Sequence, residues 1–403
     1  MSDYALEWVS LVVRWFHLTA GIAWIGASFY FVWLDDHLVA PAAESDLRRG
    51  VAGELWSVHG GGFYHNAKYL TGPRGEALTP NLHWFYWEAY STWLSGAAML
   101  AIVYWAGASS FLIDKSVLDM SVSAAIGLSF ASLVAGWLGY DALCRLFGAR
   151  PAALWTAVVL FLLASDFALF HIFGARAAYI HVGAMIGTIM VANVLFVIIP
   201  GQKRVVAQLR AGKAPDPRPG ALGKIRSVHN TYLTLPVLFI MISNHYPMTY
   251  AGPYGWLVLA FIALAGVLVR RFYILTHTKR YVPALPIAAS LVLVAVAIVF
   301  APRERIVAAG GSGAAAPHVA FVRVAPIVAR RCAVCHAAQP TQPGYASAPL
   351  GVMLDTPERI VAAAGRIREQ AVASHAMPLG NVTGMTGAER ALVGRWIDEG
   401  APR

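Results

Sequence analysis

Two cysteines and a histidine lie within five consecutive residues near the C-terminus, in the run Cys332-Ala333-Val334-Cys335-His336. This spacing lets two thiols add to the vinyl groups of a haem while the histidine binds its iron. A zinc or redox C-x-x-C is the alternative interpretation, but Cys144 is the only other cysteine and cannot complete a tetrahedral zinc site. The pattern therefore favours covalent attachment of a c-type haem.

The segments around this motif predict a small helical domain. Residues 321–328 resemble the opening helix of a class I cytochrome c, and residues 389–397 resemble its closing helix. Met377, followed by Pro378, is the expected sixth iron ligand, because a thioether raises the reduction potential of a haem. The competing ligands are Met353, Met385 and His375.

The composition indicates that most of the chain lies in lipid. The sequence has 403 residues, of which 58% are hydrophobic and only 13% charged, against roughly 25% charged in soluble proteins. The net charge of +10 is spread between long apolar runs and forms no basic stripe, so a nucleic-acid partner is not expected. The N-terminus lacks a basic region and a cleavage site, so its first apolar run is expected to be retained.

Eight apolar stretches are long enough to cross a hydrocarbon core, which takes roughly 20 residues. They are residues 8–33, 84–105, 118–140, 152–171, 178–199, 229–246, 252–269 and 283–301. The expected fold class is therefore all-α, a membrane bundle of eight transmembrane helices with a C-terminal cytochrome c domain.

Basic residues are unequally shared between alternate loops. Seventeen Lys and Arg residues fall in loops 34–83, 141–151, 200–228 and 270–282, whereas the other loops hold only Lys115 and Arg176. Because basic loops stay in the cytoplasm, both termini are expected in the periplasm of a bacterial inner membrane. Haem attachment also occurs outside the cytoplasm, so the two arguments give the same orientation.

The composition also predicts the domain boundaries. After Phe300 the chain is rich in Gly and Ala, a composition typical of a flexible linker. We expect a membrane domain over residues 1–301, a linker over 302–317 and a periplasmic cytochrome c domain over 318–403.

Polar residues inside the predicted spans are candidates for function, because they are costly in lipid. In the first span Arg14, His17 and Gly21 begin a stripe that continues through Trp24 and Ser28, and this face is expected to look into the bundle. Glu88, Thr92 and Ser95 form a similar stripe in the second span. For the small residues and for Ser and Thr, simple helix packing is the favoured explanation.

Histidines gather near both ends of the predicted bundle. Near the periplasmic side lie His17, His171, His181 and His245, and a b-type haem between two of them would relay electrons to the c haem. Ordinary hydrogen-bonded histidines are the alternative. A second group accompanies the triple glycine 60–62 on the cytoplasmic side, where either a ligand or a plain turn would explain the glycines.

Five segments resemble the bacterial membrane-bound urate oxidases, or urate hydroxylases, which carry a C-terminal cytochrome c domain. They are RWFHLTAGIAWIGASFYF (14–31), GGGFY (60–64), WFYWEAY (84–90), NTYLTLPV (230–237) and MPLGN (377–381). The resemblance covers nearly the whole chain. It implies oxidation of urate to 5-hydroxyisourate in purine catabolism, with electrons leaving through the c haem to a respiratory cytochrome c or terminal oxidase without forming hydrogen peroxide.

Urate is a planar anion, which suits a pocket with Arg for its charge and aromatic faces for stacking. Arg14, His17 and Glu88 are the candidate catalytic residues, with His17 or Glu88 as general base. Arg14 can instead extend its charge to the periplasmic interface. Two other functions stay open: a non-catalytic membrane cytochrome that relays electrons from quinol or a partner subunit, and a small-molecule transporter with an attached redox sensor.

Overall fold

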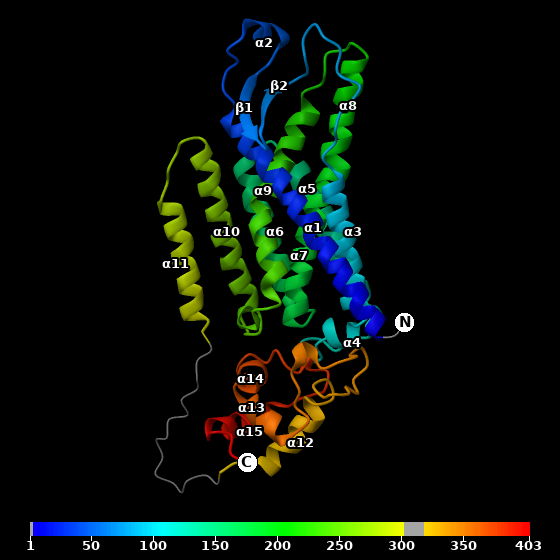
Figure 1. Ribbon diagram of the computed structural model, residues 1–403, viewed down its shortest axis with the longest axis vertical. Coiled ribbons are helices and arrows are strands. Elements are labelled where there is room, and N and C mark those ends of the chain that lie inside the picture. The colour runs from blue at the N-terminus through cyan, green and yellow to red at the C-terminus, as the bar shows by residue number, and fades with distance from the viewer. Residues whose placement is uncertain (1–2, 302–317) are drawn as a thin grey trace.

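The computed structural model describes residues 3–301 and 318–403, and both parts are mostly helical (Figure 1). Six helices are long and apolar enough to cross a membrane. They are α1 (Asp3–His37), α5 (Val122–Phe147), α6 (Pro151–Phe170), α7 (Ala175–Ala192) continued by η2 (Asn193–Ile198) and α8 (Ile199–Arg210), α9 (Arg218–Ser243) and α10 (Gly255–His277).

The remaining two predicted spans also fall on helices. Residues 84–105 contain α3 (Trp87–Met99) and the π-helical η1 (Leu100–Trp105), and residues 283–301 contain the shorter apolar helix α11 (Ala284–Val299). That these two cross the bilayer stays a prediction. Helix α10 ends eight residues later than expected, because apolar residues and good helix formers continue past Arg270, so Arg270 and Arg271 lie on the helix rather than in a loop.

Helix α7 is the centre of the bundle, and most of its side chains are buried. Small residues let its neighbours approach closely. A Cβ added to Gly136 of α5 would lie 2.2 Å from the Met185 Cγ, and one added to Gly183 of α7 would lie 2.5 Å from the Ile240 Cγ2 of α9. These contacts explain why glycine occupies both positions.

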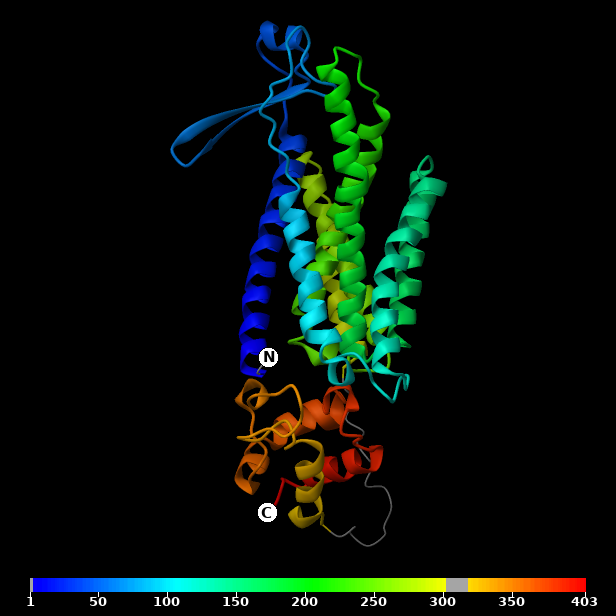
Figure 2. The same ribbon diagram turned by 90° about the vertical axis from the view of Figure 1, so that its right-hand side faces the viewer.

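A β-hairpin projects from one end of the bundle, as Figure 2 shows, and the all-α expectation omitted it. Strands β1 (Gly53–His59) and β2 (Gly62–Lys68) pair antiparallel, with His59 opposite Gly62. Gly60 and Gly61 have φ of 59° and 81°, the left-handed conformations that a tight two-residue hairpin turn needs. The triple glycine therefore closes a turn. The short helix α2 (Glu44–Arg49) lies beside this hairpin.

Residues 318–403 form a separate helical unit with its own core. Its elements are α12 (Phe321–Arg331), η4 (Pro349–Gly351), α13 (Pro357–Ala362), α14 (Ala364–Ile367), η5 (Arg368–Ala373), η6 (Leu379–Asn381) and α15 (Gly387–Asp398). Trp396 is fully buried among Val324, Val328 and Val393. The predicted linker, 302–317, lies outside the described residues.

The C-terminal unit lies at the end of the bundle opposite the hairpin, next to the beginning of α1 and the short helix α4 (Ala108–Phe111) (Figures 1 and 2). Helices η6 and α4 are in close contact, because a Cβ added to Gly380 would lie 2.9 Å from the Ser110 carbonyl oxygen of α4. The 3-10 helix η3 (Pro247–Thr249) connects α9 to α10 at this same end.

Candidate functional site

The Cys332–His336 segment forms a single turn directly after α12. The amide of Cys335 donates to the Cys332 carbonyl (3.2 Å), and so does the amide of His336 (3.0 Å). Residues three and four apart on such a turn point to the same side, so both thiols and the imidazole project from one face. Burial raises the pKa of Cys332 to about 11 and also raises that of Cys335.

The ring of His336 is oriented by its backbone surroundings. Its Nδ1 lies 2.9 Å from the Val352 carbonyl oxygen, which fixes the tautomer and leaves Nε2 as the metal-binding nitrogen. Met377 packs against the same hydrophobic core as Cys332 and Val352. Its carbonyl accepts a hydrogen bond from the buried Arg390 guanidinium (2.6 Å). These residues fit a haem held by two thiols and one imidazole.

The competing iron ligands differ in position. Met385 is 3% exposed and is a buried member of the hydrophobic core, whereas His375 is exposed and has a positive φ of 55°. Met353 is half-buried next to Val352. Met377 is half-buried and its own carbonyl accepts from the buried Arg390, and it stays the proposed ligand.

An aromatic contact joins this unit to the bundle. The ring of Tyr345 stacks on Phe111 of α4, with centroids 6.3 Å apart and an interplanar angle of 26°. Tyr345 lies within electrostatic reach of both Cys335 and Arg176, and burial raises its pKa to about 12. The proposed haem-binding turn is therefore next to the bundle surface.

Behind Phe111 a basic cluster is formed by Arg14, Tyr104, Arg176 and Asn244, which come from α1, η1, α7 and the C-cap of α9. The Arg176 Nε donates to the Asn244 Oδ1 at 3.0 Å, and its guanidinium lies 5.8 Å from the Phe111 ring centroid. Arg14 lies within electrostatic reach of Arg176 and Tyr104. Within residues 3–301 and 318–403, neither arginine forms an ion pair with a carboxylate.

The hydroxyl of Tyr104 is the most unusual member of the basic cluster. The residue is 5% exposed, and its hydroxyl lies next to Arg176 and Asn244 but makes no hydrogen bond of good geometry to any described residue. A buried polar group without a partner costs roughly 1–3 kcal/mol. Arg14 is exposed and its Nε donates to the Ser10 hydroxyl (3.2 Å), so each guanidinium keeps further N–H groups that no carboxylate among the described residues accepts. Together with the Tyr104 hydroxyl they form an arrangement that suits an anion with hydrogen-bonding edges.

One comparison with known proteins shows to which family the bundle belongs. The family described as urate oxidase N-terminal matches residues 3–301. The chain belongs to this family. No curated protein and no solved structure matches it. The matched region contains the whole bundle and the basic cluster, and it ends before the Cys332–His336 turn.

Within the urate oxidase family region, the predicted stripe on α1 does face another helix. The His17 Nδ1 lies 2.9 Å from the Thr92 carbonyl oxygen and 3.0 Å from the Ser95 hydroxyl of α3. Arg14, one turn nearer the C-terminal unit, reaches the basic cluster. Glu88 lies in the first turn of α3, towards the hairpin, and no hydrogen bond or ion pair among the described residues joins its carboxylate to Arg14 or His17.

The other periplasmic-group histidines have separate surroundings. His181 is fully buried, and both ring nitrogens are engaged, Nδ1 with the Ala177 carbonyl (2.7 Å) and Nε2 with the Ser129 hydroxyl (2.7 Å). His171 is exposed with its Nδ1 on the Phe167 carbonyl (2.7 Å), and His245 is exposed. A b-type haem in the urate oxidase region stays a prediction.

A second polar network lies deeper in the bundle. The Tyr140 hydroxyl lies 2.8 Å from the His229 Nδ1 and accepts from the Asn193 amide (3.2 Å), which also donates to Asn230 (2.9 Å). Arg226 closes the network through an ion pair with Asp141 at 2.6 Å. Its charges and amides are paired with one another, so the network needs no ligand.

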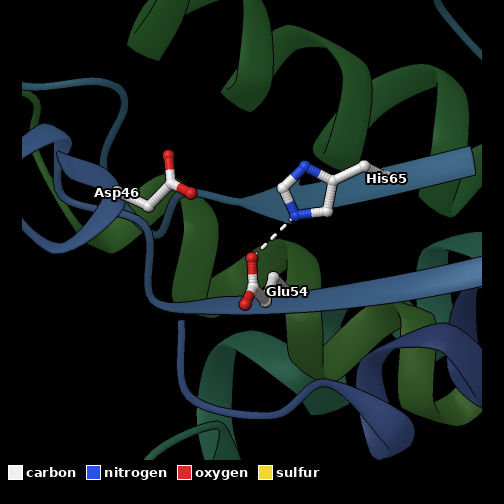
Figure 3. Close-up of side chains that lie close together, drawn as sticks. All are labelled: Asp46, Glu54 and His65. Atoms are coloured by element: carbon white, nitrogen blue, oxygen red, sulfur yellow. Dashed lines mark hydrogen bonds and ion pairs between the residues drawn. The ribbon is translucent and has the colours of Figure 1, made fainter. Parts of the chain in front are cut away.

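Near the hairpin, Asp46, Glu54 and His65 bring three oxygen and nitrogen ligand atoms within 4.8 Å of one another (Figure 3). All three side chains already have polar partners within the protein. Glu54 accepts from the Ala42 amide (2.9 Å) and pairs with the His65 Nε2 (2.7 Å), while Asp46 pairs with Arg49 at 3.2 Å. These interactions are explained by a structural role, since they stabilise the hairpin.

Sequence reasoning missed Tyr104, Asn244, Phe111 and Tyr345 as neighbours of the site, and treated Arg176 only as an exception to the charge distribution. The signal for Arg176 was present: it is one of two basic residues on the side expected to lack them. A charge against the prevailing distribution deserves a functional explanation.

Proposed function

We propose that this protein is a membrane-bound oxidoreductase that converts urate to 5-hydroxyisourate in purine catabolism. It would pass the electrons to a covalent c-type haem on Cys332 and Cys335, without making hydrogen peroxide. Membership of the urate oxidase family supports urate as the substrate. The observation that carries the proposal is the stacking of Tyr345, beside Cys335, against the bundle end that holds the basic cluster.

The proposed architecture is an eight-span urate oxidase domain over residues 1–301, a linker over 302–317 and a cytochrome c domain over 318–403. His336 and Met377 would be the axial ligands. The distribution of basic residues supports a bacterial inner-membrane protein with both termini and the cytochrome domain in the periplasm. A respiratory cytochrome c or terminal oxidase would accept the electrons.

We place the substrate in the basic cluster. Urate is a planar anion with donors and acceptors around its edge, and its negative charge would be held by the two guanidinium groups of Arg14 and Arg176. The Tyr104 hydroxyl and the Asn244 amide would bond its edge. Specificity follows because a site with buried polar groups rejects molecules that leave those groups unpaired.

Oxidation at C5 adds water to urate and releases two protons and two electrons. A c haem held by Cys332, Cys335 and His336 would serve as a one-electron acceptor, so the two electrons would have to leave in two successive transfers. His17 is the proposed general base, since its Nδ1 is held by α3 while Nε2 remains able to take a proton from water or a ring N–H. Glu88 stays a candidate for a second proton acceptor nearer the hairpin.

The alternative is a non-catalytic cytochrome that relays electrons from quinol or a partner subunit. It gains support if a b-type haem is also present, because a relay across the bilayer needs a second carrier. A pyridine haemochrome spectrum counts b-type and c-type haem separately and so tests this alternative directly.

The decisive experiment expresses the full chain with cytochrome c maturation machinery and adds urate to the membranes. Urate loss together with reduction of the c haem is expected. The matched variant Cys332→Ser/Cys335→Ser should lose the covalent haem and the urate-dependent absorbance change. Reduction of the haem by quinol but not by urate would overturn the proposal in favour of the relay.

A further inference from the structure

A cavity of about 370 Å³ lies between α1 and α10, far from the basic cluster and close to the hairpin end of both helices. Three residues from each helix line it: Phe29, Tyr30 and Trp33 of α1, and Arg270, Tyr273 and His277 of α10. Five of the six side chains are aromatic rings. The only permanent charge on its walls is the guanidinium of Arg270.

Arg270 is buried and poorly satisfied. Arg270 is 4% exposed, and its guanidinium carbon lies 3.9 Å from the Phe29 ring centroid. Its Nε and Nη2 have no hydrogen-bond partner among the described residues. A cation–π contact offsets part of the desolvation cost. The N–H groups still lack acceptors, and burying them unpaired is unfavourable.

The nearby carboxylates are committed elsewhere. Asp36 lies within electrostatic reach of Arg270 but pairs with His277 at 3.1 Å, and Asp35 pairs with Lys68 at 2.5 Å and Lys224 at 3.3 Å. Arg270 forms no ion pair in the described part of the chain. An anionic ligand in the cavity would supply the acceptors that these carboxylates do not.

The walls of the cavity decide what kind of anion fits. Both helices are candidate membrane spans, and Tyr30 and Tyr273 are 45% and 54% exposed on the outer surface of the bundle. A ligand there meets one cationic group and a broad aromatic, apolar wall. Urate would leave most of its polar edge unpaired in such a place. A phosphodiester attached to acyl chains matches both the charge and the apolar surface.

We propose that this cavity is a binding site for an anionic phospholipid, whose phosphate is held by the planar guanidinium of Arg270. Arginine suits phosphate because its fork can donate two parallel hydrogen bonds. Basic pockets between membrane helices on the cytoplasmic side are known to take acidic headgroups. The site is independent of urate oxidation, because it lies at the opposite end of α1 from the basic cluster.

The test uses the full chain in detergent with two lipid probes, phosphatidylglycerol and phosphatidylcholine. Thermal unfolding midpoints should rise with phosphatidylglycerol only, since a ligand that binds the folded state stabilises it. In Arg270→Gln the concentration of phosphatidylglycerol needed for half of this rise should increase about tenfold or more. Arg270→Lys should be intermediate, because it keeps the charge but not the fork.

Arg271→Gln is the matched control, since it removes the same charge from an exposed neighbour whose one hydrogen bond among the described residues goes to the Tyr232 hydroxyl (3.2 Å). It should behave like the unchanged chain. Equal stabilisation by phosphatidylcholine, an unchanged response in Arg270→Gln, or stabilisation by urate that Arg270→Gln abolishes would each overturn the proposal.

Discussion

Two regions of the bundle hold arginine side chains without a carboxylate partner, and they differ in what surrounds those charges. In the basic cluster Arg14 and Arg176 lie with the Tyr104 hydroxyl and the Asn244 amide, next to the C-terminal unit. In the cavity between α1 and α10, Arg270 is enclosed by aromatic rings. The charge alone indicates an anion, and the neighbours indicate which anion.

Polar neighbours can bond the edge of a small planar molecule, whereas aromatic walls can cover the glycerol and acyl region of a lipid. The two regions also lie at opposite ends of α1. Variants in one region should therefore leave the affinity of the other region for its ligand unchanged, because energetic effects at well-separated sites are usually additive.

The largest effect is expected for Arg176→Gln, which removes one guanidinium from the proposed urate site. The kcat/KM for urate should fall roughly 100-fold or more, as when one partner of a buried charge pair is lost. Steady-state urate consumption measures this. Phosphatidylglycerol should stabilise the variant as before.

Lys115→Gln is the control for Arg176→Gln, because it removes a charge from an exposed position on the same side of the bundle. Its kcat/KM should be close to that of the unchanged chain. Equal losses of kcat/KM in both variants would mean that positive charge on this side attracts urate in general, and that Arg176 does not contact the bound urate.

Some residues of the candidate sites could be predicted from their spacing in the sequence, and others could not. The Cys332–His336 turn and the Arg14–His17 face depend on residues within two helical turns, so the sequence displays them directly. Tyr104, Arg176 and Asn244 come from three helices far apart in the chain, and only tertiary packing brings them together. No local pattern contains that information.

Helix boundaries account for a second kind of miss. The apolar stretch predicts a span that ends at residue 269 and so places Arg270 in a basic loop, whereas α10 continues to His277. One further turn of helix moved this charge from a solvated loop to a buried position. The hairpin was missed because its strands are short and its glycines also suit an irregular loop.

A smaller effect is expected for Tyr104→Phe, which removes only the unpartnered hydroxyl. The KM for urate should rise about tenfold, the value of one hydrogen bond to a charged ligand. Because the hydroxyl bonds nothing among the described residues, the thermal midpoint without urate should not fall. A lower midpoint with an unchanged KM would assign the hydroxyl a structural role instead.

A weaker effect still is expected for Tyr345→Leu, which removes the aromatic contact between the C-terminal unit and Phe111. Such a contact contributes about 0.5–1.5 kcal/mol, so the equilibrium constant for docking of the C-terminal unit onto the bundle should fall by a few-fold. Stopped-flow spectroscopy should show slower haem reduction by urate but unchanged reduction by dithionite. Unchanged rates with urate would exclude this contact from the electron path.

The smallest effect is expected at the hairpin, which serves neither region. The Ala42 amide and then His65 lower the pKa of Glu54 from its ordinary value, so the contribution of Glu54 to folding is present above that ordinary value and is lost as pH falls through the lowered one. The protection factors of the β1 and β2 amides in hydrogen exchange, which are corrected for the intrinsic effect of pH on exchange, should therefore fall in acid. Glu54→Gln should show these lower protection factors already at neutral pH, while urate oxidation and the response to phosphatidylglycerol stay unchanged. A change in either response would mean that the hairpin communicates with that site, and the separation of the two regions would fail.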